Sequence, residues 1–161
     1  MDTGDAVAAR TLLDTYPANQ SCEFAWTRVL VEFISHFLLG EEGSSAADAE
    51  AALSKALAAN MSVGTLLSHH DAFAQVVDPS LVAKLAEADV GVDGSVDAAL
   101  AYTVDALSCW LDAEGATDWV ANSAQLAAAL DAADAAVEGG SALIGSAPAA
   151  RLLTEVFEFL A

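Results

Sequence analysis

The segment from Phe24 to Leu39 limits most strongly what this chain can fold into. Its large apolar residues recur at helical spacing on more than one face of the predicted helix, and they are Phe24, Trp26, Val29, Leu30, Phe33, Ile34, Phe37 and Leu38. A helix that is apolar nearly all round belongs inside a bundle, because no face of it suits water. The polar residues that interrupt the segment exclude a membrane span, and they are Thr27, Arg28, Glu32, Ser35 and His36. The sequence therefore predicts a helix bundle with this segment at its centre.

Apolar periodicity and capping residues predict the other helices. They cover about 3–15, 45–59, 63–76, 81–88, 96–111 and 118–137, with a last helix opened by Pro148. Ser45, Ser95 and Thr117 are the predicted N-caps, and Gly139-Gly140 is predicted to break the chain. No useful segment alternates with period two, so no strand is expected. We predict an all-α, single-domain bundle of about six to eight helices over residues 1–161.

The charge of the chain is extreme, with 24 Asp and Glu residues against 5 Lys and Arg residues, a net charge of −19. This excess repels nucleic acid phosphates and anionic membrane surfaces, so neither is an expected partner, and cationic partners are favoured. The carboxylates are spread along the whole chain instead of forming a tail. The alternative interpretation is an adaptation to high salt, in which the acidic surface keeps the protein soluble.

We base the expected cellular location on the two cysteines and on the N-terminal sequence. Cys22 and Cys109 lie in apolar surroundings without metal-like spacing, and we predict buried thiols rather than a disulfide. No basic N-terminal region is followed by an apolar stretch, so no secretory signal is expected. We therefore expect a cytoplasmic protein without membrane insertion.

The histidines are the candidate cofactor-binding residues. Ser68-His69-His70-Asp71 contains the residue types of a hydrolytic triad, but adjacent helical residues point about 100° apart and are not expected to converge. Leu67 to His70 followed by Val77-Asp78-Pro79 resembles the proximal-histidine stretch of globins. That resemblance implies a haem or pigment site within the bundle that uses His36, His69 or His70. The simpler alternative has one of the paired histidines facing the core and one facing water.

The paired tryptophans are candidate partner-binding residues. Trp110-Leu111, a turn, and Trp119-Val120 resemble the second homology region of Bcl-2-type proteins, although the Asn-Trp-Gly-Arg helix start of that family is missing. The resemblance implies a helical bundle with a groove that captures an amphipathic helix. The alternative is that both tryptophans anchor an internal helix corner. The acidic turn between them departs from an EF-hand loop, and we predict a solvated turn without a specific metal site.

A second candidate surface is the C-terminal apolar stripe. Its residues are Leu152, Leu153, Val156, Phe157 and Leu160, and all except Leu152 join the tryptophans as predicted partner-binding residues. Such an apolar chain is not expected to hide every large side chain in one monomer.

No catalytic constellation is recognisable in the sequence. It lacks a phosphate-binding glycine loop, a Gly-x-Ser-x-Gly motif and a Cys-x-x-Cys motif. Arg28, inside the most apolar helix, is predicted to pair with Glu32 at i, i+4 spacing. We therefore expect no resident cofactor or metal, and a non-enzymatic helical interaction or structural protein. It would bind a protein partner through an apolar groove or associate with itself. The alternatives are a haem or pigment binder and a Bcl-2-like helix-groove regulator.

The net charge predicts that folding depends on salt. Repulsion among the carboxylates opposes the compact state most where screening is weakest, so the melting temperature should rise as NaCl increases from about 0.01 M to about 1 M. Thermal unfolding followed by circular dichroism measures this. A melting temperature that stays constant or falls over this range would contradict it.

Overall fold

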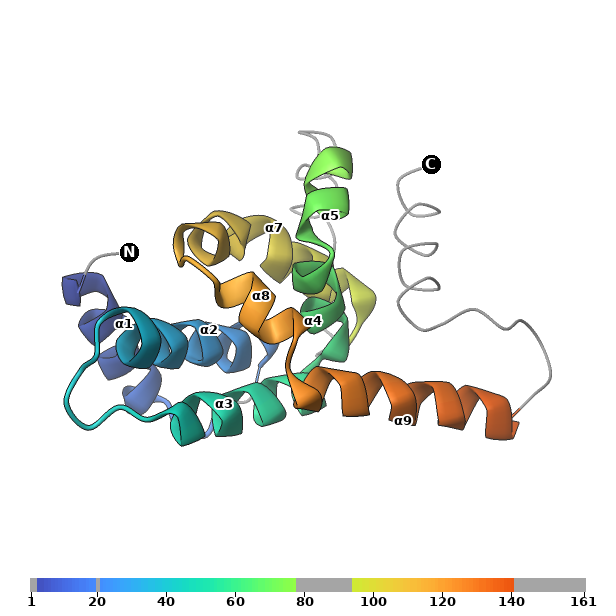
Figure 1. The fold of residues 1–161 in the computed structure, drawn as a ribbon, viewed down its shortest axis with the longest axis horizontal. Helices are drawn as coiled ribbons and strands as arrows, with labels where there is room; N and C mark the ends of the chain where they lie inside the picture. The colour runs from blue at the N-terminus through green and yellow to red at the C-terminus, as the bar shows by residue number, and fades with distance from the viewer. Residues whose placement is uncertain (1–2, 20, 78–93, 141–161) are drawn as a thin grey trace.

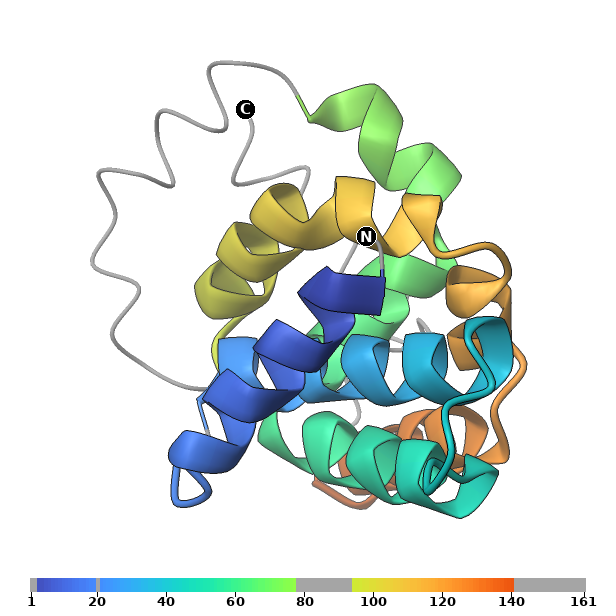
Figure 2. The same ribbon diagram turned by 90° about the vertical axis from the view of Figure 1, so that its left-hand side faces the viewer.

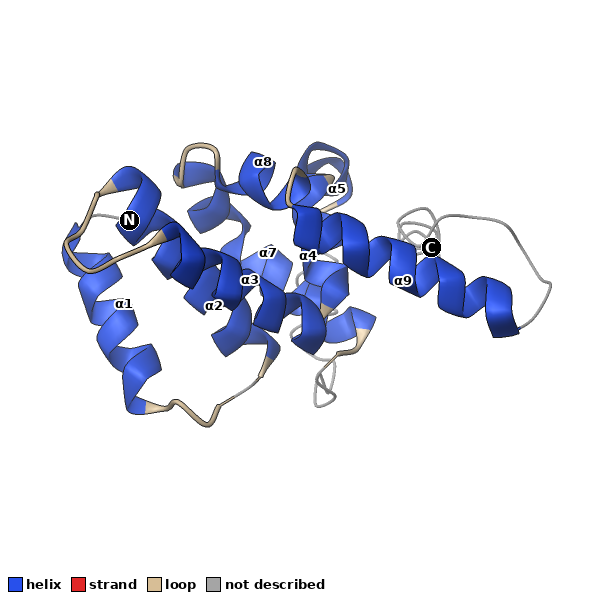
Figure 3. Ribbon diagram, turned by 60° about the horizontal axis from the view of Figure 1, so that its bottom comes forward, coloured by secondary structure: helices blue, strands red, loops and turns tan. Residues whose placement is uncertain are grey.

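The computed structural model describes residues 3–19, 21–77 and 94–140, and these residues form an all-α bundle (Figures 1 and 3). The predicted fold class is confirmed. The elements are α1 (Thr3–Thr15), α2 (Cys22–Phe33), the π-helix η1 (Ile34–Leu38), α3 (Ala46–Ala59), α4 (Met61–Ser68), α5 (His70–Val76), α7 (Val96–Asp112), α8 (Ala116–Ala121) and α9 (Ala124–Gly140). The predicted helix over 81–88 and the one opened by Pro148 lie outside the described residues.

Helix α2 is the centre of the described bundle, as its apolar pattern predicts. It contacts α1, α3 and α7, and Figure 2 shows these helices around it. Its buried residues point to several sides, and they are Cys22, Trp26, Val29, Leu30, Val31 and Phe33. Below α2, helix α9 packs against α3 and α4 and then extends beyond the other described helices (Figure 1).

Serine side chains begin three of the helices. The hydroxyls of Ser21, Ser45 and Ser95 accept the backbone N–H groups of Phe24, Asp48 and Ala98 at 3.4, 3.1 and 3.1 Å. Each bond satisfies an amide that the first helical turn leaves without a partner. The two caps predicted at Ser45 and Ser95 are therefore confirmed. Asp48 does not complete a capping box, because its carboxylate accepts from the Ser45 hydroxyl at 2.5 Å.

Two predicted helices are each divided in the structure, so their predicted extents are wrong. The helix predicted over 63–76 is broken at His69, whose backbone (φ −117°, ψ 30°) leaves the helical region between α4 and α5. The helix predicted over 118–137 is broken at Asn122 and Ser123. There Asn122 Nδ2 donates to the Asp118 carbonyl at 2.8 Å, and Ser123 Oγ accepts from the Leu126 amide at 3.2 Å. These short polar side chains compete for the backbone groups that would continue the helix.

Glycine sets the start of α8. Gly115 precedes the helix with φ +81°, a left-handed conformation that favours glycine, so α8 begins at Ala116. Thr117 therefore lies inside the helix and is not the N-cap that the sequence predicted. At the other end of this region, α9 includes both glycines of the predicted break, and its described part ends at Gly140.

Asn60 joins three parts of the bundle through a buried amide. It lies between α3 and α4, and its backbone carbonyl accepts the indole N–H of Trp26 at 3.0 Å. Its Nδ2 donates to the Ser95 carbonyl at 2.8 Å, and its Oδ1 accepts the Ser62 amide at 3.0 Å. Because Asn60 is only 3% exposed, each of these bonds replaces one that water would make in the unfolded chain.

Gly64 lets α4 approach its neighbours closely. A Cβ atom at this position would lie 3.0 Å from Leu57, 3.1 Å from Trp26 and 3.2 Å from Leu126, all side-chain atoms of other helices. These distances are shorter than ordinary van der Waals contacts. The absence of a side chain at Gly64 therefore allows side chains of α2, α3 and α9 to pack closely against α4.

The Asn60 junction predicts a selective loss of stability. Asn60→Asp keeps the Oδ1 acceptor but sets an oxygen, charged at neutral pH, against the Ser95 carbonyl. The free energy of unfolding should fall by about 2–4 kcal/mol, measured by urea denaturation. Asn122→Asp is the matched control, because the Asn122 amide also donates to a carbonyl but is exposed, and it should change the value by less than about 0.5 kcal/mol. Equal losses in the two variants would contradict the role of the junction.

Candidate functional site

Trp119 is brought to the surface by the short helix α8. The residues of α8 that face the core are Ala116, Thr117 and Val120. Trp119 lies at the edge of that buried face and is only partly buried. Its ring reaches the C-terminal end of α2, where it lies 5.4 Å from the ring of Phe33 between centroids.

Phe37 extends this aromatic contact to solvent. Its ring centroid is 5.9 Å from that of Trp119 and 5.0 Å from that of Phe33. Phe37 belongs to η1, where the Leu39 amide donates to the Ile34 carbonyl at 2.9 Å in the i to i+5 pattern. Phe33 is buried, whereas Phe37 is 44% exposed. The cluster therefore has a fixed inner ring and an accessible outer ring.

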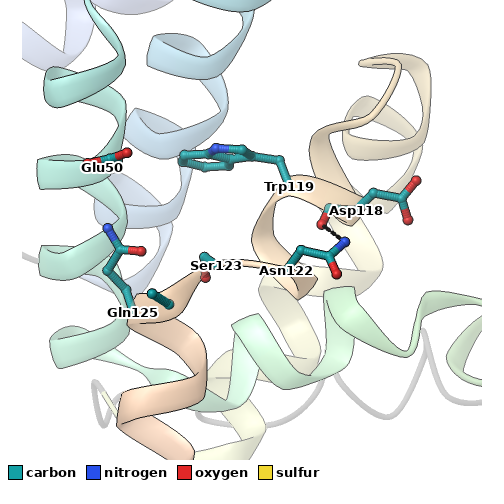
Figure 4. Close-up of a pocket in the computed structure, with 7 residues that line it drawn as sticks. Glu50, Asp118, Trp119, Asn122, Ser123 and Gln125 are labelled. Carbon is teal, nitrogen blue, oxygen red and sulfur yellow. Dashed lines mark hydrogen bonds between the residues drawn. The ribbon is translucent and has the colours of Figure 1, made fainter.

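A hollow of about 500 Å³ adjoins the cluster. Its lining residues are Glu50, Asp118, Trp119, Asn122, Ser123, Ala124 and Gln125. Figure 4 shows Glu50 reaching from α3 toward the Trp119 ring, while the Asp118 carboxylate points away from it. We call Phe37, Trp119 and this hollow the Trp119 surface.

Trp110, the other predicted tryptophan, belongs to the core. Its side chain is 0% exposed, and its indole lies edge-on to Trp26 with a centroid distance of 6.1 Å. Its Nε1–H donates to the Tyr102 hydroxyl at 3.1 Å. A partner cannot contact Trp110 in this conformation. The structure therefore separates the two tryptophans into an internal anchor and a partly exposed surface residue.

Tyr102 is held neutral by its surroundings. Burial raises the pKa of its hydroxyl well above the ordinary value of a tyrosine, because a phenolate would lose its hydration. Hydrogen bonds with Trp110 and Thr27 lower the pKa, but by less than burial raises it. The neutral hydroxyl thereby remains in place as the acceptor for Trp110.

None of the three histidines lines the hollow next to Trp119. His36 lies beside Phe37, with 4.7 Å between ring centroids. His70 Nδ1 is 3.1 Å from the Leu67 carbonyl. Among the described residues no group of three or more His, Cys, Asp or Glu side chains is arranged to hold a metal ion. Cys22 and Cys109 do not form a disulfide.

Ser68 and His69 do converge, which corrects the prediction that they point apart. Ser68 Oγ lies 3.0 Å from His69 Nδ1, because His69 has left the helical conformation. The Asp71 carboxylate is 3.5 Å from His70 Nε2 and does not orient His69. His69 Nδ1 is also 3.0 Å from the Thr65 carbonyl, to which it can only donate. The pair therefore lacks the third group of a hydrolytic triad.

The predicted Arg28 ion pair is confirmed and belongs to a larger cluster. Arg28 lies 3.5 Å from Glu32 and makes a shorter contact, 2.7 Å, with Asp14. Arg10 bridges Glu32 and Glu41 at 3.0 Å each. Both arginines are thus occupied within the chain, tying α1 to α2 and to the loop after η1.

The remaining predicted partner-binding residues, Leu153, Val156, Phe157 and Leu160, lie outside the described residues. In the part of the chain that is described, no helix combines the length and the apolar character that crossing a bilayer requires. Comparisons with protein-family models, with curated proteins and with solved structures gave no match. The resemblances to globins and to Bcl-2-type proteins therefore rest only on the short motifs that suggested them.

Tyr102 predicts a loss of stability at alkaline pH. Its folded pKa lies above the unfolded value of about 10, so its contribution is complete below that pH and is lost as the pH rises beyond it. The free energy of unfolding, obtained from denaturant titrations, should therefore fall as the pH rises above about 10. Tyr102 should contribute up to about 1.4 kcal/mol of this fall per pH unit. Tyr102→Phe should flatten the slope while destabilising the protein at neutral pH, since the Trp110 N–H loses its acceptor. Tyr16→Phe, at an exposed tyrosine, should keep the full slope, and equal slopes in the two variants would contradict the assignment.

Proposed function

We propose that this chain is a non-enzymatic interaction protein that binds a protein partner through the Trp119 surface. The observation that carries the proposal is the pair of packed aromatic rings, Phe37 and Trp119, which are tilted by 48° to each other and left partly open beside a hollow. Tryptophan is the residue type most enriched where truncation weakens protein–protein binding most. As part of the same proposal, the protein acts in the cytoplasm.

The Trp119 surface is prepared for binding by the residues beneath it. Phe33 is buried and its ring packs against both outer rings, so neither ring has to be ordered when a partner binds. Less conformational entropy is lost when such a surface binds than when a loose side chain does. Burying the open part of Phe37 would then contribute to affinity with little opposing cost.

A different protein is favoured over a second copy as the partner. Two copies would each bring a net charge of −19 into contact, and this repulsion opposes association except at high salt. Exposed apolar residues on α1 and directly after it, namely Val7, Leu12 and Tyr16, offer a separate surface for the homo-oligomer alternative. Sedimentation at low and high salt distinguishes the two, because only self-association would strengthen as salt is added.

The haem and Bcl-2-like alternatives receive less support from the geometry. The hollow at Trp119 has no histidine in its lining, so it offers no axial nitrogen for haem iron. The Bcl-2-like alternative rests on the short motif around the two tryptophans, and of these Trp110 is fully buried and offers no contact to a partner. We therefore base the proposal on Trp119 alone.

A photo-crosslinking experiment tests the proposed function. A photoreactive phenylalanine analogue placed at position 37 should form one dominant adduct with another protein in the cells that make this chain. Adding Trp119→Ala should reduce that adduct about tenfold, since losing such an anchor removes more than about 1 kcal/mol of binding energy. Circular dichroism checks that each variant is folded.

The matched control places the same analogue at position 16, where Tyr16 is an exposed aromatic residue directly after α1. No comparable adduct should form there. Equal adducts at both positions, or an adduct at position 37 that survives Trp119→Ala, would contradict the proposal. An adduct with the mass of two copies of this chain would favour the homo-oligomer.

A further inference from the structure

The hollow at Trp119 carries negative charge that the described chain does not neutralise. Glu50 and Asp118 both belong to its lining, are exposed and make no salt bridge with any described residue, although only the Glu50 carboxylate points toward the Trp119 ring. The Glu50 carboxylate reaches toward Trp119, which places an anion beside the partly exposed indole (Figure 4). An aromatic ring and a carboxylate at one hollow are the two groups that most favour a bound cation.

The described cations of the chain are not placed to fill this hollow. Arg10 and Arg28 are held in the ion-pair cluster between α1 and α2. Lys55 is on α3 with Glu50, but lies about 140° around the helix axis from it, so it projects from another side of the helix. Neither the hollow nor its aromatic rim includes a positive group.

From these observations we infer the chemistry of the partner, an inference that rests on the proposed function. We propose that a basic amphipathic segment of another protein docks on the Trp119 surface, with one Lys or Arg side chain in the hollow between Trp119 and Glu50. An apolar side chain of the same segment packs on Phe37. A second copy of this chain fits poorly, since it would bring 24 acidic residues and only 5 basic ones.

The local site and the overall charge have separate effects. The net charge of −19 accelerates the approach of any cation, an effect that salt screens. The hollow adds a preferred orientation of the bound side chain, because the guanidinium of an arginine can lie on the indole of Trp119 while donating to Glu50. Gln125 lines the same hollow, and its side-chain carbonyl is a further acceptor, whereas the Ser123 hydroxyl is already bonded to the Val120 carbonyl and the Leu126 amide. Binding that depends on one particular carboxylate therefore separates the site from diffuse attraction.

The experiment uses a defined probe and the intact chain. The probe is a synthetic helical peptide with arginines on one face and leucine and phenylalanine on the other, titrated at physiological ionic strength by calorimetry and by NMR of the indole N–H groups. We expect the Trp119 indole signal to shift, and the signals of the buried Trp26 and Trp110 to stay in place. Glu50→Gln should weaken binding about threefold to fivefold, the effect of one exposed ion pair.

The matched control is Glu42→Gln, which removes the same charge from an exposed glutamate outside the hollow. It should change the dissociation constant by less than about 1.5-fold. Equal weakening by Glu50→Gln and Glu42→Gln would overturn the inference in favour of diffuse attraction. Because both glutamates are exposed, neither substitution should unfold the protein.

A second peptide, with every arginine replaced by glutamine, separates this inference from the proposed function. Equal binding of both peptides at Trp119 would overturn the cationic partner and leave the docking surface intact. Binding of neither peptide would overturn both the docking surface and the cationic partner. Binding of spermine in place of the arginine peptide, with the same Glu50 dependence, would show a site for small polyamines and overturn the protein segment.

Discussion

The hydrogen bond from the Trp26 indole to the Asn60 carbonyl is the interaction on which the rest of the described bundle depends. It fixes the corner between α3 and α4 against the central helix, and the Asn60 side chain extends the same junction to Ser95 at the start of α7. Gly64 then brings α4 against the Trp26 ring, one turn beyond this corner. Helix α7 starts at this junction, and its C-terminal end leads through Gly115 into α8. A buried polar junction thus anchors the start of the segment that leads to Trp119.

Arg10 and Arg28 form ion pairs within the chain, so their positive charges do not compensate the carboxylates at the surface. Arg10 and Arg28 both contact Glu32, whose side chain is only 14% exposed, and each reaches a second carboxylate. Such partly buried, shared pairs keep the charge of Glu32 compensated where water is scarce. The remaining carboxylates at the surface have few cations to meet. The protein therefore presents a negative field to its surroundings, while the charges of Arg10 and Arg28 are used in ion pairs within the chain.

The sequence predicts helices best where a capping serine precedes an apolar pattern, as at Ser45 and Ser95. It fails at His69 and at Asn122, because side-chain bonds to nearby carbonyls end those helices and leave no break in the apolar periodicity. The candidate site is predicted only in part. Trp119 stands out by residue type, but its contact with Phe37 joins two segments far apart in the sequence, and no local pattern encodes such a pairing. Glu50 reaches the site from a third segment, and nothing distinguishes it in the sequence from the other acidic residues.

Trp110 and Trp119 show why residue type alone does not assign a role. Both follow apolar helical patterns near one turn, yet Trp110 has a buried acceptor in Tyr102 and an aromatic neighbour in Trp26, which together satisfy its polar and apolar parts. Trp119 packs on Phe33, while part of its ring remains open toward the hollow. Phe33 belongs both to the hydrophobic core and to the aromatic cluster, so the surface rests on the same packing that stabilises α2. The partner proposed for this surface would meet an extension of the core, so that little ordering of the two rings would oppose its binding.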